Sequence, residues 1–209
     1  MTEPTIVLPS RVTRDWVARR LTADFASLPE RDSLPVYRHP PERTPVPAAV
    51  LVPLVDRPEG TTILLTQRTA HLNAHAGQIS FPGGRVDPGD VDRVDTALRE
   101  TVEEIGLGRE RIAPLGFLPD YDIATGFRVT PVVGWVEPPF DLQPDPFEVA
   151  DIFEVPLAFI LDAANHRRHS EMREGRMRHY YSMPYESRYI WGATAGMLHT
   201  LFRLLAKED

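Results

Sequence analysis

Hydrophobic and polar residues recur along the chain with two periods, one typical of helices and one of strands. Residues 10–28 place apolar side chains at helical spacing after Ser10, a candidate cap, and predict an amphipathic helix that packs on the rest of the protein. Its apolar positions are Val12, Trp16, Val17, Leu21 and Phe25. A second helical pattern runs from Asp90 to Ile105 and stops at Gly106, a candidate C-terminal cap. A third covers about 191–206.

Shorter apolar runs bounded by turn residues predict strands. These runs cover 48–55, 61–68, 112–118, 127–136 and 149–155, and a polar hairpin is expected over 167–183 with its turn at Glu174–Gly175. The Gly-rich residues 69–90 are expected to form a loop. Because strands precede and follow the central helix, the pattern predicts an α/β fold with a mixed sheet between helices. We expect one domain over 1–209, made of an N-terminal helix and Pro-rich arm (1–45) and a core (46–209).

Composition excludes several classes of function. Hydrophobic residues make up 42% of the 209 residues and charged residues 25%, so a packed core is expected. The chain has no cysteine, which excludes disulfides, thiol nucleophiles and Cys-ligated zinc. A net charge of −7 argues against a nucleic-acid partner, and no apolar run is long enough to cross a membrane. The N-terminus lacks a signal-peptide pattern, so a cytoplasmic location is expected.

The helix expected over 90–105 carries an acidic cluster. At roughly 100° per residue, its apolar side should face the core and consists of Val94, Leu98, Thr101, Val102 and Ile105. Glu100, Glu103 and Glu104 lie within an arc of roughly 100° on the opposite side. Like charges one turn apart repel, and the helix dipole disfavours anions near its C-terminal end. A divalent cation such as Mg²⁺ would relieve both effects, and a solvated acidic face is the alternative.

The residues before this helix favour the metal site. Pro82-Gly83-Gly84 allows a sharp turn and a close backbone approach. Asp90 closes a turn that begins at Asp87, and it is placed to cap the helix. Arg99 lies beside the acidic side, where its guanidinium can fix the orientation of a carboxylate. The turn, the acidic helix and the closing glycine are together more specific than any one of them.

Residues 84–107 resemble the Nudix box, in which a Gly and a spaced acid precede an Arg-Glu-apolar-x-Glu-Glu-x-Gly-apolar run. Here the run reads RETVEEIGL, from Arg99 to Leu107. The first acid is Asp90 instead of Glu, one extra residue precedes Arg99, and Thr101 stands where an aliphatic residue is usual. An Asp with one extra spacer is typical of the coenzyme A pyrophosphatase branch of this family.

A second stretch resembles a signature of the same branch, LLTxR followed by a spaced Gly and FPGG. Residues 64–84 read LLTQRTAHLNAHAGQISFPGG and match it at Arg68, Gly77 and the FPGG residues. Asn73 stands where the branch often has Arg. YIWGATAGML at 189–198 is also similar to this branch, so the resemblance covers 48–200 and leaves out the N-terminal helix.

The resemblance implies a Nudix-type α/β/α sandwich and hydrolysis of a nucleoside diphosphate derivative with Mg²⁺ or Mn²⁺. For this branch it implies cleavage of coenzyme A (CoA) to 3′,5′-ADP and 4′-phosphopantetheine, so the expected partner is CoA or a related nucleotide. Glu100 and Glu104 are the first choice as metal ligands, and Glu103 would complete the site. Arg99 is expected to orient these carboxylates. Candidate substrate contacts are Arg68, Gly83 and Gly84, and the residues expected to shape the motif are Asp90 and Gly106.

Some assignments stay open. The general base could be Glu100, or an acid outside the box, namely Glu148, Asp151 or Glu154. Weaker candidates for phosphate contacts are Arg128 and the pair Arg167–Arg168. The substrate could also be a derivative of the ADP-ribose or NADH type, and a non-catalytic nucleotide sensor is a further alternative. The late aromatic residues are expected to lie mostly in the core; they are Tyr180, Tyr181, Tyr185, Tyr189 and Trp191.

Overall fold

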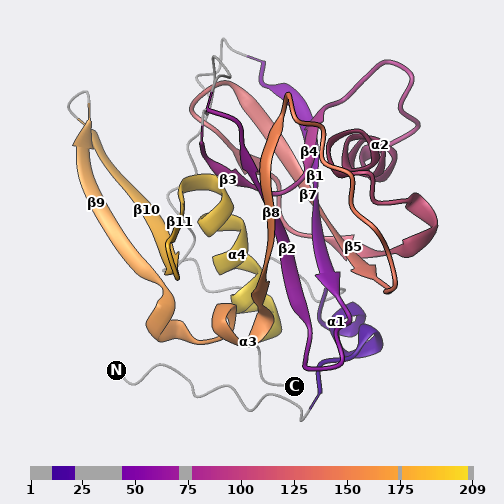
Figure 1. Cartoon of the computed structure of the whole chain (residues 1–209). Coiled ribbons are helices and arrows are strands. Elements are labelled where there is room, and N and C mark those ends of the chain that lie inside the picture. The colour runs from indigo at the N-terminus through magenta and orange to yellow at the C-terminus, as the bar shows by residue number, and fades with distance from the viewer. Residues whose placement is uncertain (1–10, 22–43, 71–76, 174–175, 207–209) are drawn as a thin grey trace.

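A mixed sheet lies at the centre of the protein, which we analyse as a computed structural model describing residues 11–21, 44–70, 77–173 and 176–206 (Figure 1). Its strands are β1 (Val46–Val55), β2 (Thr62–Arg68), β3 (Ile79–Ser80), β4 (Gly83–Arg85), β5 (Ile112–Phe117), β6 (Tyr121–Asp122), β7 (Phe127–Val136) and β8 (Val149–Pro156). The order is β3-β2-β1-β7-β5, with β4 on β1, β6 on β7 and β8 on β2. Since β1 runs parallel to β7 and antiparallel to β2, the predicted mixed sheet is confirmed.

Helices cover both faces of this sheet (Figure 1). Helix α2 (Arg93–Ile105) packs on one face, where Ala97 and Ile105 join a core cluster with Leu51 and Val55 of β1. Helix α4 (Gly192–Leu205) packs on the other face, in a second cluster that contains Val52 and Leu54 of β1. Successive side chains of β1 therefore pack alternately into two core clusters, as expected for a strand buried on both faces. Helix α1 (Arg14–Leu21) joins the cluster of α4 through Val17 and Leu21.

A second, three-stranded antiparallel sheet lies beside α4 (Figure 1). It contains β9 (Arg167–Arg173), β10 (Arg176–Tyr185) and β11 (Arg188–Trp191). The sequence predicts the hairpin but not β11, and Trp191 is the cap of α4 and not its first residue. The expectation of mostly buried aromatics is wrong for Tyr189 and Trp191, which are 48% and 42% exposed. The remaining short elements are α3 (Leu157–Ile160), η3 (Arg109–Arg111) and η4 (Ala163–Asn165).

The Gly-rich stretch is not all loop, because β3 and β4 lie within it. Strand β4 pairs with β1 through Gly83 and Gly84, and Gly83 has a φ of 151°. A Cβ at Gly83 would collide with the backbone of Ala49 and Val50. Glycine makes this close pairing possible, yet it leaves no alternation of side chains by which a strand could be predicted.

Several predictions fall outside the described residues: Ser10, Phe25, most of the arm, and the turn at Glu174–Gly175. In the part of the chain that the structure describes, no helix combines the length and the apolar character that a membrane crossing requires.

Candidate active site

Helix α2 ends as the sequence predicts but begins differently. Gly106 is its C-cap with a φ of 69°, and the Gly106 N–H donates to the Val102 carbonyl at 2.9 Å. The N-cap is Asp92, whose Oδ1 accepts from the Asp95 N–H at 2.8 Å. The prediction that Asp90 caps the helix is therefore wrong. The carboxylate of Asp90 turns instead toward the side of the helix, where a guanidinium binds it.

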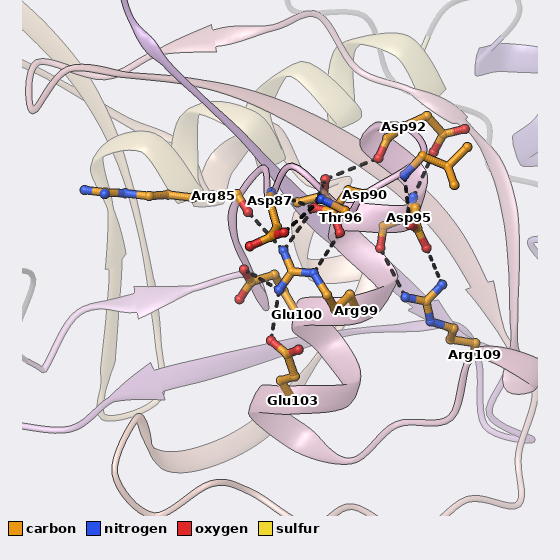
Figure 2. Close-up of polar contacts among 12 residues, drawn as sticks. Arg85, Asp87, Asp90, Asp92, Asp95, Thr96, Arg99, Glu100, Glu103 and Arg109 are labelled. Atoms are coloured by element: carbon orange, nitrogen blue, oxygen red, sulfur yellow. Dashed lines mark hydrogen bonds and ion pairs between the residues drawn. The ribbon is translucent and has the colours of Figure 1, made fainter.

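That guanidinium belongs to Arg99, the centre of the contacts in Figure 2. Arg99 Nε and Nη2 donate to the two oxygens of Asp90 at 2.8 and 3.0 Å. Arg99 Nη1 donates to Glu100 at 3.0 Å and to Glu103 at 2.9 Å, and Nη2 also donates to the Arg85 carbonyl at 3.1 Å. These bonds occupy all five N–H donors of the guanidinium. Ion pairing with Arg99 holds the pKa of Asp90 well below its usual range. We call this set of residues the Arg99 network.

Glu104 lies outside that network and is buried. Its exposed fraction is 5%, whereas Val102, expected on the core side, is 39% exposed. Glu104 is seven residues from the buried Ala97, so the two lie within roughly 20° of each other around the helix axis. Burial raises the pKa of Glu104 to about 8, although the Gly83 N–H, 3.1 Å from Glu104 Oε2, and Arg68 act in the opposite direction.

A loop distant in sequence adds a further acid, Glu148. The Asp145 N–H donates to the carbonyl of Glu104, and the Glu148 N–H donates to the carbonyl of Asp145. The Glu148 carbonyl in turn accepts from Thr69, just after β2. Arg68 Nη1 lies 3.6 Å from Glu104 Oε1, and its Nη2 lies 4.0 Å from Glu148 Oε2. We call Arg68, Glu104 and Glu148 the Arg68 cluster.

Gly84 lets Glu100 approach the sheet. A Cβ at Gly84 would overlap the carboxylate of Glu100, so only glycine leaves room for this side chain. Partial burial raises the pKa of Glu100, against the hydrogen bond and the charge of Arg99. Gly83 contacts Glu104 and Gly84 lies against Glu100, so strand β4 lies directly against two carboxylates of the helix.

Comparison with known proteins agrees with this arrangement. Residues 45–174 match the family model of the NUDIX domain. The chain is 36% identical over 197 residues to the uncharacterized Nudix hydrolase NudL of Yersinia pestis (strain Pestoides F), over 94% of this chain and 96% of that protein. This chain belongs to the Nudix family. NudL of Yersinia pseudotuberculosis serotype O:1b (strain IP 31758) has the same identity and coverage.

Solved structures are also similar to this Nudix chain. A crystal structure of a C. elegans Ap4A hydrolase binary complex has a TM-score of 0.46 and 26% identity, over 53% of this chain and 80% of that chain. The family model and the match to NudL show that the chain is a Nudix hydrolase, and its fold is α/β with a mixed sheet. Nudix hydrolases generally require a divalent metal ion such as Mg²⁺ or Mn²⁺.

The other charged candidates lie apart from the Nudix helix or are paired elsewhere. Asp151 is bound by Arg188 at 2.7 Å, and Glu154 is bound by Arg57 at 2.5 and 3.1 Å. Arg128 binds both oxygens of Asp122, at 2.7 and 3.0 Å. Arg167 and Arg168 are exposed on β9. Of the three acids outside the box, only Glu148 therefore faces the glutamates of α2, and its sequence neighbours carry no signal that distinguishes it.

The donor chemistry fits a hard divalent ion, but the side chains have not converged on one. Within the described residues, no three acidic or histidine side chains meet as ligands of a single ion. Glu100 and Glu103 turn to Arg99, whereas Glu104 turns to Gly83 and Arg68. Carboxylate oxygens are nevertheless the ligands that Mg²⁺ and Mn²⁺ prefer. Charge repulsion from Glu100 and Glu148 raises the pKa of Glu104 further, and a cation would relieve this repulsion.

Proposed function

We propose that this chain is a pyrophosphatase that uses Mg²⁺ or Mn²⁺ to hydrolyse CoA and its derivatives to 3′,5′-ADP and 4′-phosphopantetheine. One observation carries the proposal. Arg68 ends the LLTQR stretch and Gly83 lies in FPGG, and both contact Glu104 of the box. The stretch that resembles the CoA branch is therefore part of the same site as the box carboxylates. This shared site supports a substrate whose diphosphate contacts both the LLTQR–FPGG stretch and the metal held by the box carboxylates.

Each residue in this proposal has a role that follows from its surroundings. Glu100 and Glu104 would hold the cation, with Glu103 completing the set after it leaves Arg99. When bound, the cation supplies positive charge to the diphosphate and acts as a Lewis acid toward the phosphoryl group. Gly83 and Gly84 would contact the diphosphate through their backbone, since the space that a Cβ would take is filled by β1 at Gly83 and by the Glu100 carboxylate at Gly84. Arg99 positions Glu100 and does not touch the substrate.

The general base in this proposal is Glu148. Its side chain is 47% exposed, so water can reach it, and it faces both Glu104 and Glu100. Glu100 is the second candidate, although its bond to Arg99 and its place against Gly84 suit a ligand better. A base must lie within reach of the attacking water and must not be tied up by a strong ion pair. Asp151 and Glu154 fail the second condition.

Product analysis tests this function. The purified chain is incubated with Mg²⁺ and either CoA, ADP-ribose or NADH, and the products are separated by chromatography. We expect 3′,5′-ADP and 4′-phosphopantetheine from CoA, at the highest kcat/KM of the three. Cleavage of ADP-ribose or NADH without cleavage of CoA would overturn the substrate assignment. Binding of CoA by both wild type and Glu104→Gln, without turnover by either, would indicate a sensor.

A further inference from the structure

The guanidinium of Arg68 lies between Glu104, a ligand of the proposed metal ion, and Glu148, the proposed general base. It is 3.6 Å from Glu104 and 4.0 Å from Glu148, and it therefore stands in for a bound cation. We propose that Arg68 is an exchangeable counter-ion. It neutralises Glu104 and Glu148 before the metal binds, and it turns to the substrate diphosphate when the metal replaces it. This inference rests on the proposed function, because that function supplies both the metal and the diphosphate.

The contacts of Arg68 are loose enough to be exchanged. Both ion-pair distances exceed the 2.7–3.2 Å that is usual for an N–H···O hydrogen bond. In the described part of the chain, its guanidinium has these two ion pairs and makes no hydrogen bond. Arg99, whose guanidinium binds other glutamates of α2, makes five. The donors of Arg68 are thus available to an incoming anion, whereas those of Arg99 are not.

The backbone places Arg68 at the edge of the cluster with access to solvent. The pairing of β2 with β8 is irregular between Gln67 and Arg68, and Arg68 lies opposite Val149, the residue after Glu148. Such a bulge re-aims the side chain that follows it. The Arg68 side chain is 27% exposed, compared with 6% for that of Glu104. The guanidinium can therefore leave the glutamates by rotating its own side chain, without displacing the core.

Charge gives the direction of the exchange. Three carboxylates, those of Glu100, Glu104 and Glu148, repel one another, and the single positive charge of Arg68 compensates only part of this repulsion. A divalent ion compensates more and forms direct bonds to oxygen. A divalent ion bound to these carboxylates and the guanidinium of Arg68 would repel each other in this partly desolvated site. The guanidinium moves because it binds the carboxylates more weakly than a divalent ion does, and because its side chain is free to rotate.

The diphosphate gives the displaced guanidinium a new partner. A guanidinium binds two phosphate oxygens at once through its planar fork, which the ammonium group of lysine cannot do. Arg68 would then strengthen diphosphate binding only when the metal is present. Since coupling between two ligands is reciprocal, the diphosphate would also strengthen metal binding through the same residue. A fixed phosphate-binding arginine would instead favour the diphosphate equally with and without metal.

Calorimetric titration of the full chain tests this coupling with two probes, Mn²⁺ and imidodiphosphate, an analogue that resists hydrolysis. In Arg68→Gln we expect Mn²⁺ alone to bind at least about 3-fold more tightly than in wild type. With saturating Mn²⁺, imidodiphosphate should bind about 10-fold or more weakly, the usual loss for a charge-assisted hydrogen bond. Without Mn²⁺, its affinity should change by less than about 2-fold. Arg68→Lys keeps the charge without the fork, and it should weaken imidodiphosphate binding while Mn²⁺ binding stays near wild type.

The control is Arg57→Gln, which removes an arginine that is paired with Glu154 outside the cluster. It should leave all three affinities unchanged. Equal weakening of imidodiphosphate with and without Mn²⁺ in Arg68→Gln would overturn the exchange, and so would weaker or unchanged binding of Mn²⁺ alone. Failure of wild type to bind Mn²⁺ would also overturn it. The proposed function is judged separately, by whether wild type releases 3′,5′-ADP from CoA.

Discussion

Two arginines face the glutamates of α2, and their surroundings differ. The contacts of Arg99 suit a structural role, whereas those of Arg68 suit a role in ligand binding. In the Arg99 network every guanidinium donor is used, and Asp90 is held as a fully compensated anion. In the Arg68 cluster the ion pairs are long, and burial raises the pKa of Glu104 to about 8. A saturated network gains nothing from a ligand. A buried carboxylate with weak compensation gains a great deal from a cation, and for this reason we propose that the ion binds at Glu104.

Removal of the buried charge should have the largest effect. Glu104→Gln keeps the size of the side chain but removes the anion, so we expect kcat/KM to fall by about 10³-fold, or ~4 kcal/mol in transition-state stabilisation. The melting temperature at neutral pH should not fall, because burial disfavours the anionic form of Glu104 and glutamine is a neutral side chain of the same size. Steady-state kinetics and thermal denaturation measure the two effects. Glu137→Gln, at a largely exposed residue, is the control, and a loss below 10-fold in Glu104→Gln would contradict the account.

Activity should be nearly as sensitive to a change in strand β4. Gly84→Ala would place a methyl group against the carboxylate of Glu100, and we expect kcat/KM to fall by about 10–100-fold because a ligand is displaced by a fraction of an ångström. Gly89→Ala is the matched control, since a Cβ there meets only Asp87 Oδ1 at 3.4 Å. Comparable activity in the two variants would show that the close approach of Gly84 has no functional meaning.

The Arg99 network should respond in the opposite sense, with stability affected more than turnover. Asp90→Asn removes the anion that binds two donors of Arg99, so we expect a melting temperature several degrees lower. Glu100 and Glu103 still bind Arg99, so kcat should fall much less than in Glu104→Gln. Thermal denaturation and kinetics of the two variants, measured side by side, compare the regions directly. A larger kcat loss in Asp90→Asn than in Glu104→Gln would reverse our division between them.

A buried histidine outside the site should give the smallest effect on activity. Burial lowers the pKa of His199 to about 3, and its Nε2 has no hydrogen-bond partner among the described residues. Because the unfolded state binds a proton near pH 6.5 and the folded state does not, stability is complete above this pH and is lost as pH falls toward 3. The loss is about 1.4 kcal/mol per pH unit.

Thermal denaturation from pH 7 to pH 5 tests whether His199 lowers the stability of the fold as the pH falls. We expect the melting temperature of wild type to fall more steeply than that of His199→Phe, while the kcat values of the two proteins at pH 7.5 stay within about 2-fold. His179→Phe serves as the control, since His179 lies on the second sheet and is bound by Ser170. If the melting temperatures of wild type and His199→Phe fell equally with pH, the lowered pKa of His199 would be contradicted. The expected result would show that a buried group with a shifted pKa need not lie in an active site.

The sequence predicts the fold well where side chains alternate or repeat. Strand β7 and the C-terminal end of α2 lie where the pattern places them, because Phe127–Val136 is a long apolar run and Gly106 adopts the left-handed conformation. Strand β4 is missed because its residues are mostly glycine, and it forms only through pairing with β1. Asp90 is misplaced as a cap because its partner, Arg99, lies nine residues away in sequence, in the middle of α2.

The site is predicted less completely, for a related reason. Helical spacing alone puts Glu104 on the same side as Glu100 and Glu103, but it cannot show that this side lies against β4 and is partly buried. Glu148 reaches the cluster through backbone hydrogen bonds of a loop to the end of α2, and these bonds leave no pattern in the side chains. Local periodicity thus identifies the carboxylates, whereas tertiary contacts decide which of them is desolvated.

Metal binding by single-charge variants tests the central claim most directly. The number of Mn²⁺ ions bound per chain, and their dissociation constants, are measured by electron paramagnetic resonance for wild type, Glu104→Gln and Glu137→Gln. We predict a site in wild type and in Glu137→Gln that is absent or at least about 100-fold weaker in Glu104→Gln. Equal Mn²⁺ binding by all three proteins would contradict the claim that the buried carboxylate of Glu104 is where the ion binds.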